Sequence, residues 1–505
     1  MSTGTKALLI GAAVFPVVVV AAAFAGWNAL IAFGPSFEIP SGPAIDPPPS
    51  YLGAPASARP VDVPPVPQHP YMAPNGRSSI HADAYMSDTN TWAAPLGREP
   101  QTSSTFQVGE CATVTFDSQG RIVTLCVRPV GRFLAMIEPD SLDRVATFDL
   151  PDREGGLPAA LSGNALTDFS GGGYFYLDHR DRAVVPTTTR HVYVIAQTEG
   201  PGFELERDID LSGAISEDDA ITSVLPDWEG RQWFVTTDGT VGTVPRGGTG
   251  AAGAMGLGED IENSFAVDET GGVFVVSDRA MYRFDAGRSA HPVVSWRRPY
   301  PNSGVQKPGQ SDDASGTTPT LLGRRWVGIT DNAEHLGLVV YDRRSRTDGK
   351  RQVCREPVFE PGRGATENTL IGAGRSFLVE NNYGYTGPTS TLLAGTTEPG
   401  FARVDIDRDG RGCHLVWESD VRAPSVVPKL SIANGLVYTY TKPAGATSEP
   451  WYLTALDFRT GRTAYETRAG RGLGHNNNYA PVTLGPDGSA FVGALGGLIR
   501  IADSR

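Results

Sequence analysis

Two polar runs in this sequence contain more carboxylate and amide groups than a turn requires. They are Glu380-Asn381-Asn382-Tyr383 and His475-Asn476-Asn477-Asn478, and each borders a segment of strand-like composition. A turn needs only one Asn or Asp, because one such residue can adopt the left-handed conformation and bond the neighbouring main chain. The excess indicates a binding site. Ordinary loop chemistry stays the alternative explanation for each single asparagine.

Further polar residues occur in the same context, at the ends of strand-like segments. They are Glu262, Asn263, Asp331, Asn332, His335, Glu367 and Asn368. Carboxylate and amide oxygens suit calcium, which takes six to eight oxygen ligands. We therefore expect Glu262, Glu367 and Glu380 as metal ligands, and His335 or His475 as a general base beside a metal-bound water. The expected binding residues are Asn263, Asp331, Asn332, Asn368, Asn381, Asn382, Tyr383, Lys429 and Asn476.

The elements that must position these residues form a repeat. From about Thr113 to Asp503 the chain repeats a β-rich segment, a tight Gly turn, a second β-rich segment and weaker strands. Spacings of roughly 40 to 57 residues match the length of a four-stranded propeller blade. We predict an all-β, eight-bladed β-propeller over residues 76–505, with seven blades as the alternative. A strand from between His81 and Gln107 is expected to close the last blade, so that no sheet edge is exposed.

Blade topology predicts which residues share a face. Residues before the innermost strand and after the second strand emerge at one mouth of the central channel, and the Gly turns lie at the other. All the polar candidates above are expected at the first mouth, which we take as the working face. Lys429 lies in a predicted inner strand and faces the channel, where it binds an anionic substrate group or pairs with Glu380 or another carboxylate.

The segment His81-Ala82-Asp83-Ala84-Tyr85-Met86-Ser87-Asp88 precedes the ring. One interpretation is a strap across the channel mouth that adds His81, Asp83 or Asp88 to the site. The other is an ordered lead-in that only supplies packing.

The N-terminal region predicts export. Residues 7–33 are apolar and uncharged, which is long enough to cross a bilayer. Lys6 precedes this stretch and Glu38 follows it, so we expect a single-pass cell-membrane anchor over residues 1–34 with the propeller on the extracytoplasmic side. A cleaved signal peptide, with processing at Ala23-Phe24-Ala25, is the alternative and gives a secreted protein. The Pro-rich linker, residues 35–75, is expected to be a stiff extended spacer.

Four cysteines in an exported chain indicate two disulfides. If Ser118 and Gln119 form the tip of the first hairpin, Cys111 and Cys126 lie directly opposite one another across its strands. Cys354 and Cys413 are then paired by elimination.

Composition excludes one class of partner. The formal net charge is -13, and no Lys/Arg cluster offsets it, so no nucleic acid is expected as a ligand. The sequence contains no Gly-x-Ser-x-Gly motif, no phosphate-binding loop and no His-Glu-x-x-His motif.

The stretch from Leu453 to Tyr465, with Ala455, Asp457 and Thr460-Gly461, resembles the blade signature of quinoprotein-like (PQQ-like repeat) propellers. In that family the Asp and Thr-Gly form the turn between the outer two strands, and a terminal Trp packs between blades. Here Tyr465 replaces the Trp. The second half also resembles uncharacterised exported actinobacterial propeller proteins, through Glu380 to Pro388 and Ala423 to Lys429.

The resemblance implies pyrroloquinoline quinone and calcium for redox members, and a scaffold role for members that lost the cofactor. This chain lacks the Cys-Cys pair and the Cys-x-x-Cys-His motif that often accompany the quinone, which disfavours that cofactor. Our first hypothesis is a membrane-anchored binding or scaffold protein of the cell envelope, with an envelope protein, lipid, glycan or small molecule as its partner. The alternatives are a calcium-dependent lactonase or esterase and a quinone-dependent dehydrogenase, so whether the protein is an enzyme stays open.

Overall fold

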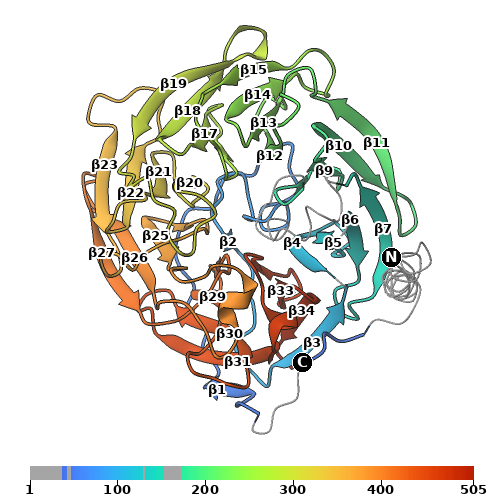
Figure 1. Cartoon of the computed structure of the whole chain (residues 1–505), viewed down its shortest axis with the longest axis vertical. Helices are drawn as coiled ribbons and strands as arrows, with labels where there is room; N and C mark the ends of the chain where they lie inside the picture. Colours follow the sequence, from blue (N-terminus) through green and yellow to red (C-terminus); the bar gives the residue numbers. More distant parts are fainter. Residues whose placement is uncertain (1–36, 42–46, 108, 129–130, 153–171, 505) are drawn as a thin grey trace, which may run out of the picture.

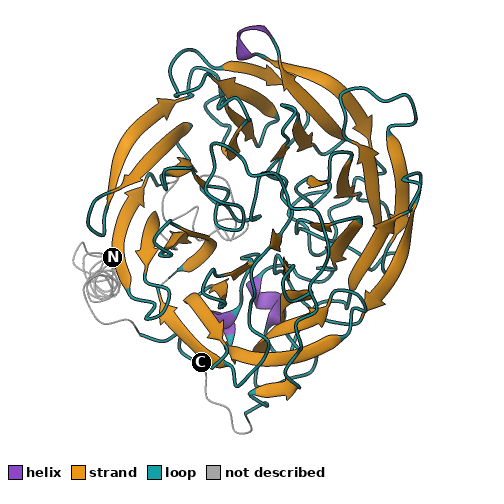
Figure 2. Cartoon of the chain, turned by 180° about the vertical axis from the view of Figure 1, so that it is seen from behind, coloured by secondary structure: helices purple, strands orange, loops and turns teal. Residues whose placement is uncertain are grey.

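Eight antiparallel sheets are arranged around a central channel in the computed structural model, which describes residues 37–41, 47–107, 109–128, 131–152 and 172–504. Seen down the short axis of the molecule, the sheets form a closed ring (Figure 1). The prediction of an all-β propeller with eight blades is therefore confirmed, and the seven-bladed alternative is wrong. Apart from three short 3-10 helices, all regular elements among the described residues are strands (Figure 2).

Each blade has its innermost strand at the channel and its outermost strand at the rim, in chain order except in the eighth. Blades 1 to 4 are formed by β4 (Glu110–Phe116), β5 (Ile122–Val127), β6 (Arg132–Ile137) and β7 (Arg144–Leu150); β8 (Tyr176–Leu177), β9 (Ala183–Pro186), β10 (His191–Gln197) and β11 (Phe203–Asp210); β12 (Ile221–Pro226), β13 (Gln232–Thr236), β14 (Thr240–Val244) and β15 (Gly253–Gly256); and β16 (Ala266–Val267), β17 (Val273–Val276), β18 (Ala280–Ala286) and β19 (Pro292–Pro299).

Blades 5 to 8 follow the same plan. They are formed by β20 (Thr320–Leu322), β21 (Trp326–Thr330), β22 (Gly337–Asp342) and β23 (Gln352–Pro357); β24 (Ile371–Ala373), β25 (Ser376–Glu380), β26 (Phe401–Ile406) and β27 (Cys413–Ser419); β28 (Lys429–Ser431), β29 (Leu436–Thr441), β30 (Pro450–Asp457) and β31 (Thr463–Arg471); and β32 (Val482–Leu484), β33 (Ala490–Ala494), β34 (Gly497–Ala502) and β3 (Gln101–Phe106).

The turns between the two inner strands of blades 1, 2 and 3 share one hydrogen-bond arrangement. In blade 1 the Oδ1 of Asp117 accepts the main-chain N–H groups of Gln119 and Arg121, both at 2.9 Å, and its Oδ2 accepts the Arg121 Nε at 2.8 Å. Asp178 with Arg182 and Asp227 with Arg231 repeat this arrangement in blades 2 and 3. A single Asp thus closes the turn and pairs with the Arg that follows it.

The eighth blade is closed by the N-terminal part of the chain. β3 pairs antiparallel with β34, from Gln101 opposite Ala502 to Phe106 opposite Gly497. The closing strand lies within the predicted range, and closure from both ends of the chain protects the edge of the last sheet. Blade 7 also gains two strands, β1 (Tyr51–Gly53) at its rim and β2 (Thr89–Asn90) at the channel.

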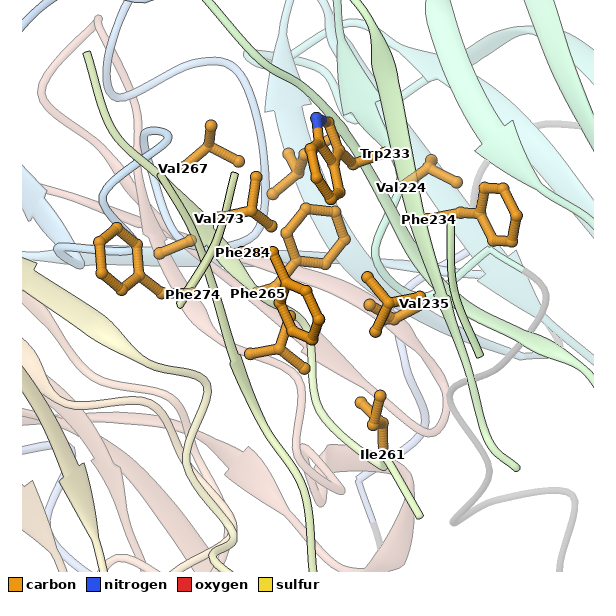
Figure 3. Close-up of a cluster of buried hydrophobic side chains, with 14 of the residues drawn as sticks. Val224, Trp233, Phe234, Val235, Ile261, Phe265, Val267, Val273, Phe274 and Phe284 are labelled. Atoms are coloured by element: carbon orange, nitrogen blue, oxygen red, sulfur yellow. The ribbon is translucent and has the colours of Figure 1, made fainter. Parts of the chain in front are cut away.

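Apolar side chains fill the space between neighbouring blades. Figure 3 shows this packing between blades 3 and 4, where Trp233, Phe265, Phe274 and Phe284 are fully buried. The resemblance implied that Asp457 and Thr460-Gly461 form the turn between two outer strands. In the structure, Asp457 accepts the Arg459 and Thr460 N–H groups in the turn between β30 and β31.

Both predicted disulfides are present. Cys111 and Cys126 are partners across β4 and β5, with a Cα–Cα distance of 4.0 Å. Cys354 on β23 and Cys413 on β27 link the outer strands of blades 5 and 6.

From residue 50 onward the Pro-rich segment lies against the ring. β1 pairs with β31, and the N–H groups of Arg59 and Val61 bond the carbonyls of Asn434 and Ile432 near the Gly turn of blade 7. Proline cannot donate from its nitrogen, but the residues between the prolines can, and they provide these contacts.

Residues 77–92, here called the channel segment, continue from the Pro-rich segment into the centre of the ring (Figure 1). Its carbonyls accept N–H groups from residues at or next to the C-terminal ends of inner strands: Phe116, Leu177, Val267, Leu321, Gly372, Leu430 and Ile432. These residues precede the Gly turns, so the channel segment occupies the mouth at which those turns lie. The segment from His81 to Asp88 thus packs into the mouth opposite to the expected working face.

The predicted membrane anchor, residues 1–34, lies outside the described residues. Within the part of the chain that the structure describes, no helix is both long and apolar enough to span a bilayer.

Candidate functional site

Glu380 lies at the expected mouth, at the end of β25, and is surrounded by donors from blades 6 and 7. Its Oε1 accepts the amide groups of Asn382 at 2.7 Å and Asn368 at 3.0 Å, and its Oε2 is 3.5 Å from the Thr439 hydroxyl. Burial raises the pKa of Glu380 well above its usual value, against the lowering effect of these hydrogen bonds. The carboxyl group therefore acts as a buried hydrogen-bond centre between loops.

Glu367 lies at the same mouth in a different environment. Its Oε1 accepts the Ser311 hydroxyl, and its Oε2 is buried without a hydrogen-bond partner among the described residues. Burial, followed by the negative charge of Asp312 and more weakly that of Glu262, raises its pKa well above the usual value. Burial also raises the pKa of Asp312 to about 6. The negative charges that act on Glu367 are thus those of Asp312 and of the predicted site residue Glu262.

The predicted asparagines bond mainly to neighbouring loops. The Asn381 amide donates to the carbonyls of Arg363 and Pro399 at 2.9 and 3.0 Å, and its oxygen accepts two main-chain N–H groups. The others with such contacts to main-chain carbonyls are Asn263, Asn332, Asn368, Asn382 and Asn476. Most of this amide chemistry holds the long loops of the mouth together, as the loop alternative predicted.

Asp331 and Tyr383 have local roles as well. Asp331 is buried, accepts the N–H groups of Ala333 and Gly337, and pairs with the Arg355 Nε at 2.5 Å. Tyr383 is half-buried and bonds Asn381 and Glu398 through its main chain.

Neither predicted catalytic histidine contacts the carboxylates. The Nε2 of His335 donates to the Phe359 carbonyl at 2.9 Å, and the Nδ1 of His475 donates to the Arg471 carbonyl at 2.9 Å. Burial lowers the pKa of His475 to about 4. Among the described residues, no hydrogen bond connects either ring to Glu262, Glu367 or Glu380, and their role as general bases stays a prediction.

The residues present do not fit the expected calcium site. Across the described ranges, no group of three His, Cys, Asp or Glu side chains is arranged to hold a metal ion. The Oε1 of Glu380 already accepts two amide groups. Calcium binding stays a prediction, and no reaction step is derived from it.

Lys429 pairs with a carboxylate of the channel segment. Its Nζ contacts Asp88 and donates to the Ile80 carbonyl at 2.6 Å, and Asp88 also contacts the His81 Nδ1 at 3.2 Å. All three side chains are almost completely buried. Burial lowers the pKa of Lys429, and the negative charge of Asp88 opposes that shift. The paired role of Lys429 is correct, but its partner is Asp88 and not Glu380.

A second buried ion cluster holds the channel segment from the other side. The Nη2 of Arg343, on a side chain that is 1% exposed, donates to the Tyr85 hydroxyl at 2.9 Å, and its Nη1 pairs with Asp268. The Tyr85 hydroxyl in turn contacts Glu269. Sequence reasoning missed Arg343, because a single Arg after a strand gives no signal that it reaches a segment more than 250 positions earlier.

A cavity of about 530 Å³ opens at the mouth where the Gly turns lie, between the Pro-rich segment and blades 5 and 6. One wall is the run from Val63 to Pro67, and the facing wall is made by the turns 321–324 and 372–374. Asp83, Tyr85, Thr89 and Thr91 of the channel segment line it as well. We call this cavity the proline groove. It lies at the Gly-turn mouth, which we had not expected to be the working face.

Comparison with known proteins gives the fold. No protein-family profile matches the sequence. An uncharacterized protein of Archaeoglobus fulgidus is 29% identical over 317 residues, which cover 56% of this chain and 61% of that protein, so the chain spans about three-fifths of its curated relative. A europium-containing methanol dehydrogenase aligns with a TM-score of 0.51 at 10% identity, covering 83% of this chain and 96% of that one.

Two further solved structures are more distant. BamB from Moraxella catarrhalis aligns with a TM-score of 0.41 at 15% identity, over 64% of this chain and 86% of that one. A streptogramin B lyase aligns with a TM-score of 0.38 at 9% identity, over 80% and 97%. At such identities a likeness describes architecture and leaves the activity to the site itself. In architecture, this chain is an eight-bladed β-propeller.

Proposed function

We propose that this protein is a membrane-tethered binding propeller of the cell envelope and that the proline groove is its ligand site. The observation that carries the proposal is the construction of the groove: the chain's own N-terminal segment docks on the ring and encloses a cavity with the turns of blades 5 and 6. Ligand sites are concave and mostly apolar, with few polar groups, and measure about 300–1,000 Å³. The groove has this size and this composition.

The chemistry of the walls indicates the ligand class. Val63, Pro64 and Pro65 provide apolar surface, and proline offers no N–H group to a ligand. Asp83 and Tyr85 are already engaged in hydrogen bonds within the protein. Arg324 lines the groove with a side chain that is 88% exposed, and its Nε lies 3.8 Å from the Glu269 carboxylate. The groove therefore suits an amphiphile whose apolar body lies along the prolines and whose anionic head reaches Arg324.

The rigidity of the ring supports a binding role. Both buried ion clusters hold the channel segment, which lines the groove, and a disulfide joins the outermost strands of blades 5 and 6. A preformed site loses little conformational entropy when it binds.

Native mass spectrometry of the full-length protein, released from its own membrane, tests the proposal. The wild-type protein should retain a small amphiphilic molecule. Thr91→Trp, which fills the groove from an exposed lining position, should lose it, and Arg324→Gln should retain less of it. Gln352→Trp, on the exposed rim of blade 5, is the matched control and should behave as wild type. Equal occupancy in all four proteins, or an empty wild type, contradicts the proposal.

A further inference from the structure

An apolar loop projects from the mouth opposite to the Gly turns. It follows β25 and contains the 3-10 helix η3 (Pro388–Thr391), Leu392 and Leu393. Leu393 is 96% exposed, and Leu473, in the 3-10 helix η4 (Leu473–His475), is 41% exposed. Figure 2 shows η3 and η4 side by side, and the Asn476 amide joins them through the Thr391 hydroxyl at 3.0 Å. Exposed apolar groups that gather on one face indicate an interaction surface.

The loop is held in this exposed conformation. Leu393 and Ala394 both have positive φ, at 54° and 64°, a conformation that side chains other than glycine rarely adopt. The Ala394 N–H donates to the Glu449 Oε1 at 2.7 Å, and Lys442 pairs with the same carboxylate at 2.6 Å. The Lys442 Nζ also donates to the Gly395 carbonyl at 3.0 Å. The exposure of Leu393 is therefore built into the loop by specific partners.

The N-terminal chain reaches the ring beside this loop. Ile39 is buried, its N–H bonds the Ser104 hydroxyl at 3.0 Å, and a Cβ placed on Gly474 of η4 would lie 3.1 Å from its side chain. The Phe37 carbonyl accepts the Phe106 N–H at 2.6 Å. The apolar stretch predicted to be the membrane anchor ends at Phe33, six residues before Ile39, and six residues span about 22 Å at most. An anchored chain would therefore hold η4 within about that distance of the bilayer surface.

We propose that Leu392, Leu393 and Leu473 form a membrane-contact surface, which enters the headgroup region of the bilayer that holds the anchor. This inference rests on the membrane tether in the proposed function. Transfer of apolar side chains from water into the headgroup region is favourable in free energy, and a rigid loop presents these side chains in place. Because the chain carries a net charge of -13, the contact depends on apolar burial and not on attraction to anionic lipids. The proline groove, at the opposite mouth, then faces away from the membrane.

Fluorescence of the full-length protein in liposomes tests the surface. A Leu393→Cys variant labelled with NBD should show blue-shifted emission, and lipids that carry a spin label near the headgroups should quench most of it. The control is Ser118→Cys with the same label, at an exposed turn of the Gly-turn mouth, which should show neither effect. Replacing zwitterionic lipid by anionic lipid should leave the Leu393 signal unchanged or weaker.

A second pair of variants keeps the test independent of the label at residue 393. A probe on Thr389→Cys, also exposed, should be quenched by the same lipids and lose that quenching when Leu393→Ser is added. Flotation after alkaline extraction reports the anchor separately: failure to float overturns the tether and this surface with it. A protein that floats but shows no lipid quenching at residue 393 overturns the membrane-contact surface alone. A blue shift without lipid quenching shows that residue 393 contacts protein and not lipid, and this result also overturns the membrane-contact surface.

Discussion

The pair between Asp88 and Lys429 should anchor the channel segment in the ring. Both side chains are almost fully buried, at 0% and 2% exposure. Removing one partner leaves an unpaired buried charge, which costs about 3–5 kcal/mol. Unfolding entropy of about 2.1 cal/mol/K per residue gives roughly 1.1 kcal/mol/K for 505 residues, so each single substitution should lower the melting temperature by about 3–5 °C.

A double-mutant cycle isolates the pair. Lys429→Met and Asp88→Asn are each expected to be destabilising, and their combination should cost less than the sum, since it leaves neither charge unpaired. Differential scanning calorimetry of the four full-length proteins at pH 8 measures the coupling. Burial lowers the pKa of His81 most strongly, and the positive charge of Lys429 lowers it further. In Lys429→Met the second effect is removed, so the loss should shrink as the pH falls, because His81 protonates more readily beside Asp88. Single variants that melt within 1 °C of wild type, or strictly additive losses, would refute the reasoning.

Four other outcomes follow from the structure. Burial raises the pKa of Asp83 to about 7, so the stability that its protonated carboxyl contributes is fully present below the usual pKa of Asp and is lost as the pH rises through 7. Asp83→Asn should therefore be more stable than wild type at pH 8. Melting temperatures that depend on pH in the same way in both proteins would speak against this. Glu380→Gln should melt within about 1 °C of wild type and respond to calcium as wild type does, and loss of a calcium-induced shift would restore Glu380 as a metal ligand. A chain that begins at Thr113 lacks β3 and the channel segment and should be insoluble or markedly less stable; equal melting would refute the closure. Peptide mapping without reduction should join Cys111 to Cys126 and Cys354 to Cys413, and free thiols from the native compartment would exclude these pairs.

The sequence predicted the ring well because blades are local. Each inner pair of strands is joined by a short turn, and the Asp and Gly residues of that turn mark the repeat directly. The closing strand and the Cys111–Cys126 pair followed from the same repeat, since antiparallel register fixes which residues lie opposite.

The site was harder to predict because its contacts join segments far apart in the chain. Asp88 and Lys429 are separated by 341 positions, and Tyr85 and Arg343 by 258. Neither pair has a spacing that a local pattern could show. The Pro-rich segment was expected to stand free since its composition resembles a spacer, but the N–H groups between its prolines find partners on blade 7.

The asparagine runs have a structural role that composition alone does not reveal. Asn381 and Asn476 donate to main-chain carbonyls of neighbouring loops, and their predicted ligand contacts stay a prediction. Long loops have many carbonyls outside sheets, and buried carbonyls need partners. A ring with long loops at one mouth therefore requires amide side chains there for its own folding.

Photolabelling with a photoreactive medium-chain carboxylic acid tests the central claim, that the proline groove binds an amphiphile, most directly. Full-length wild-type protein should carry the label on peptides that contain residues 63–67, 89–91, 321–324 or 372–374. Thr91→Trp should lose the label on these peptides, and Gln352→Trp should keep it. A wild-type protein without label in these four segments, or a groove label that Thr91→Trp leaves unchanged, would contradict the account.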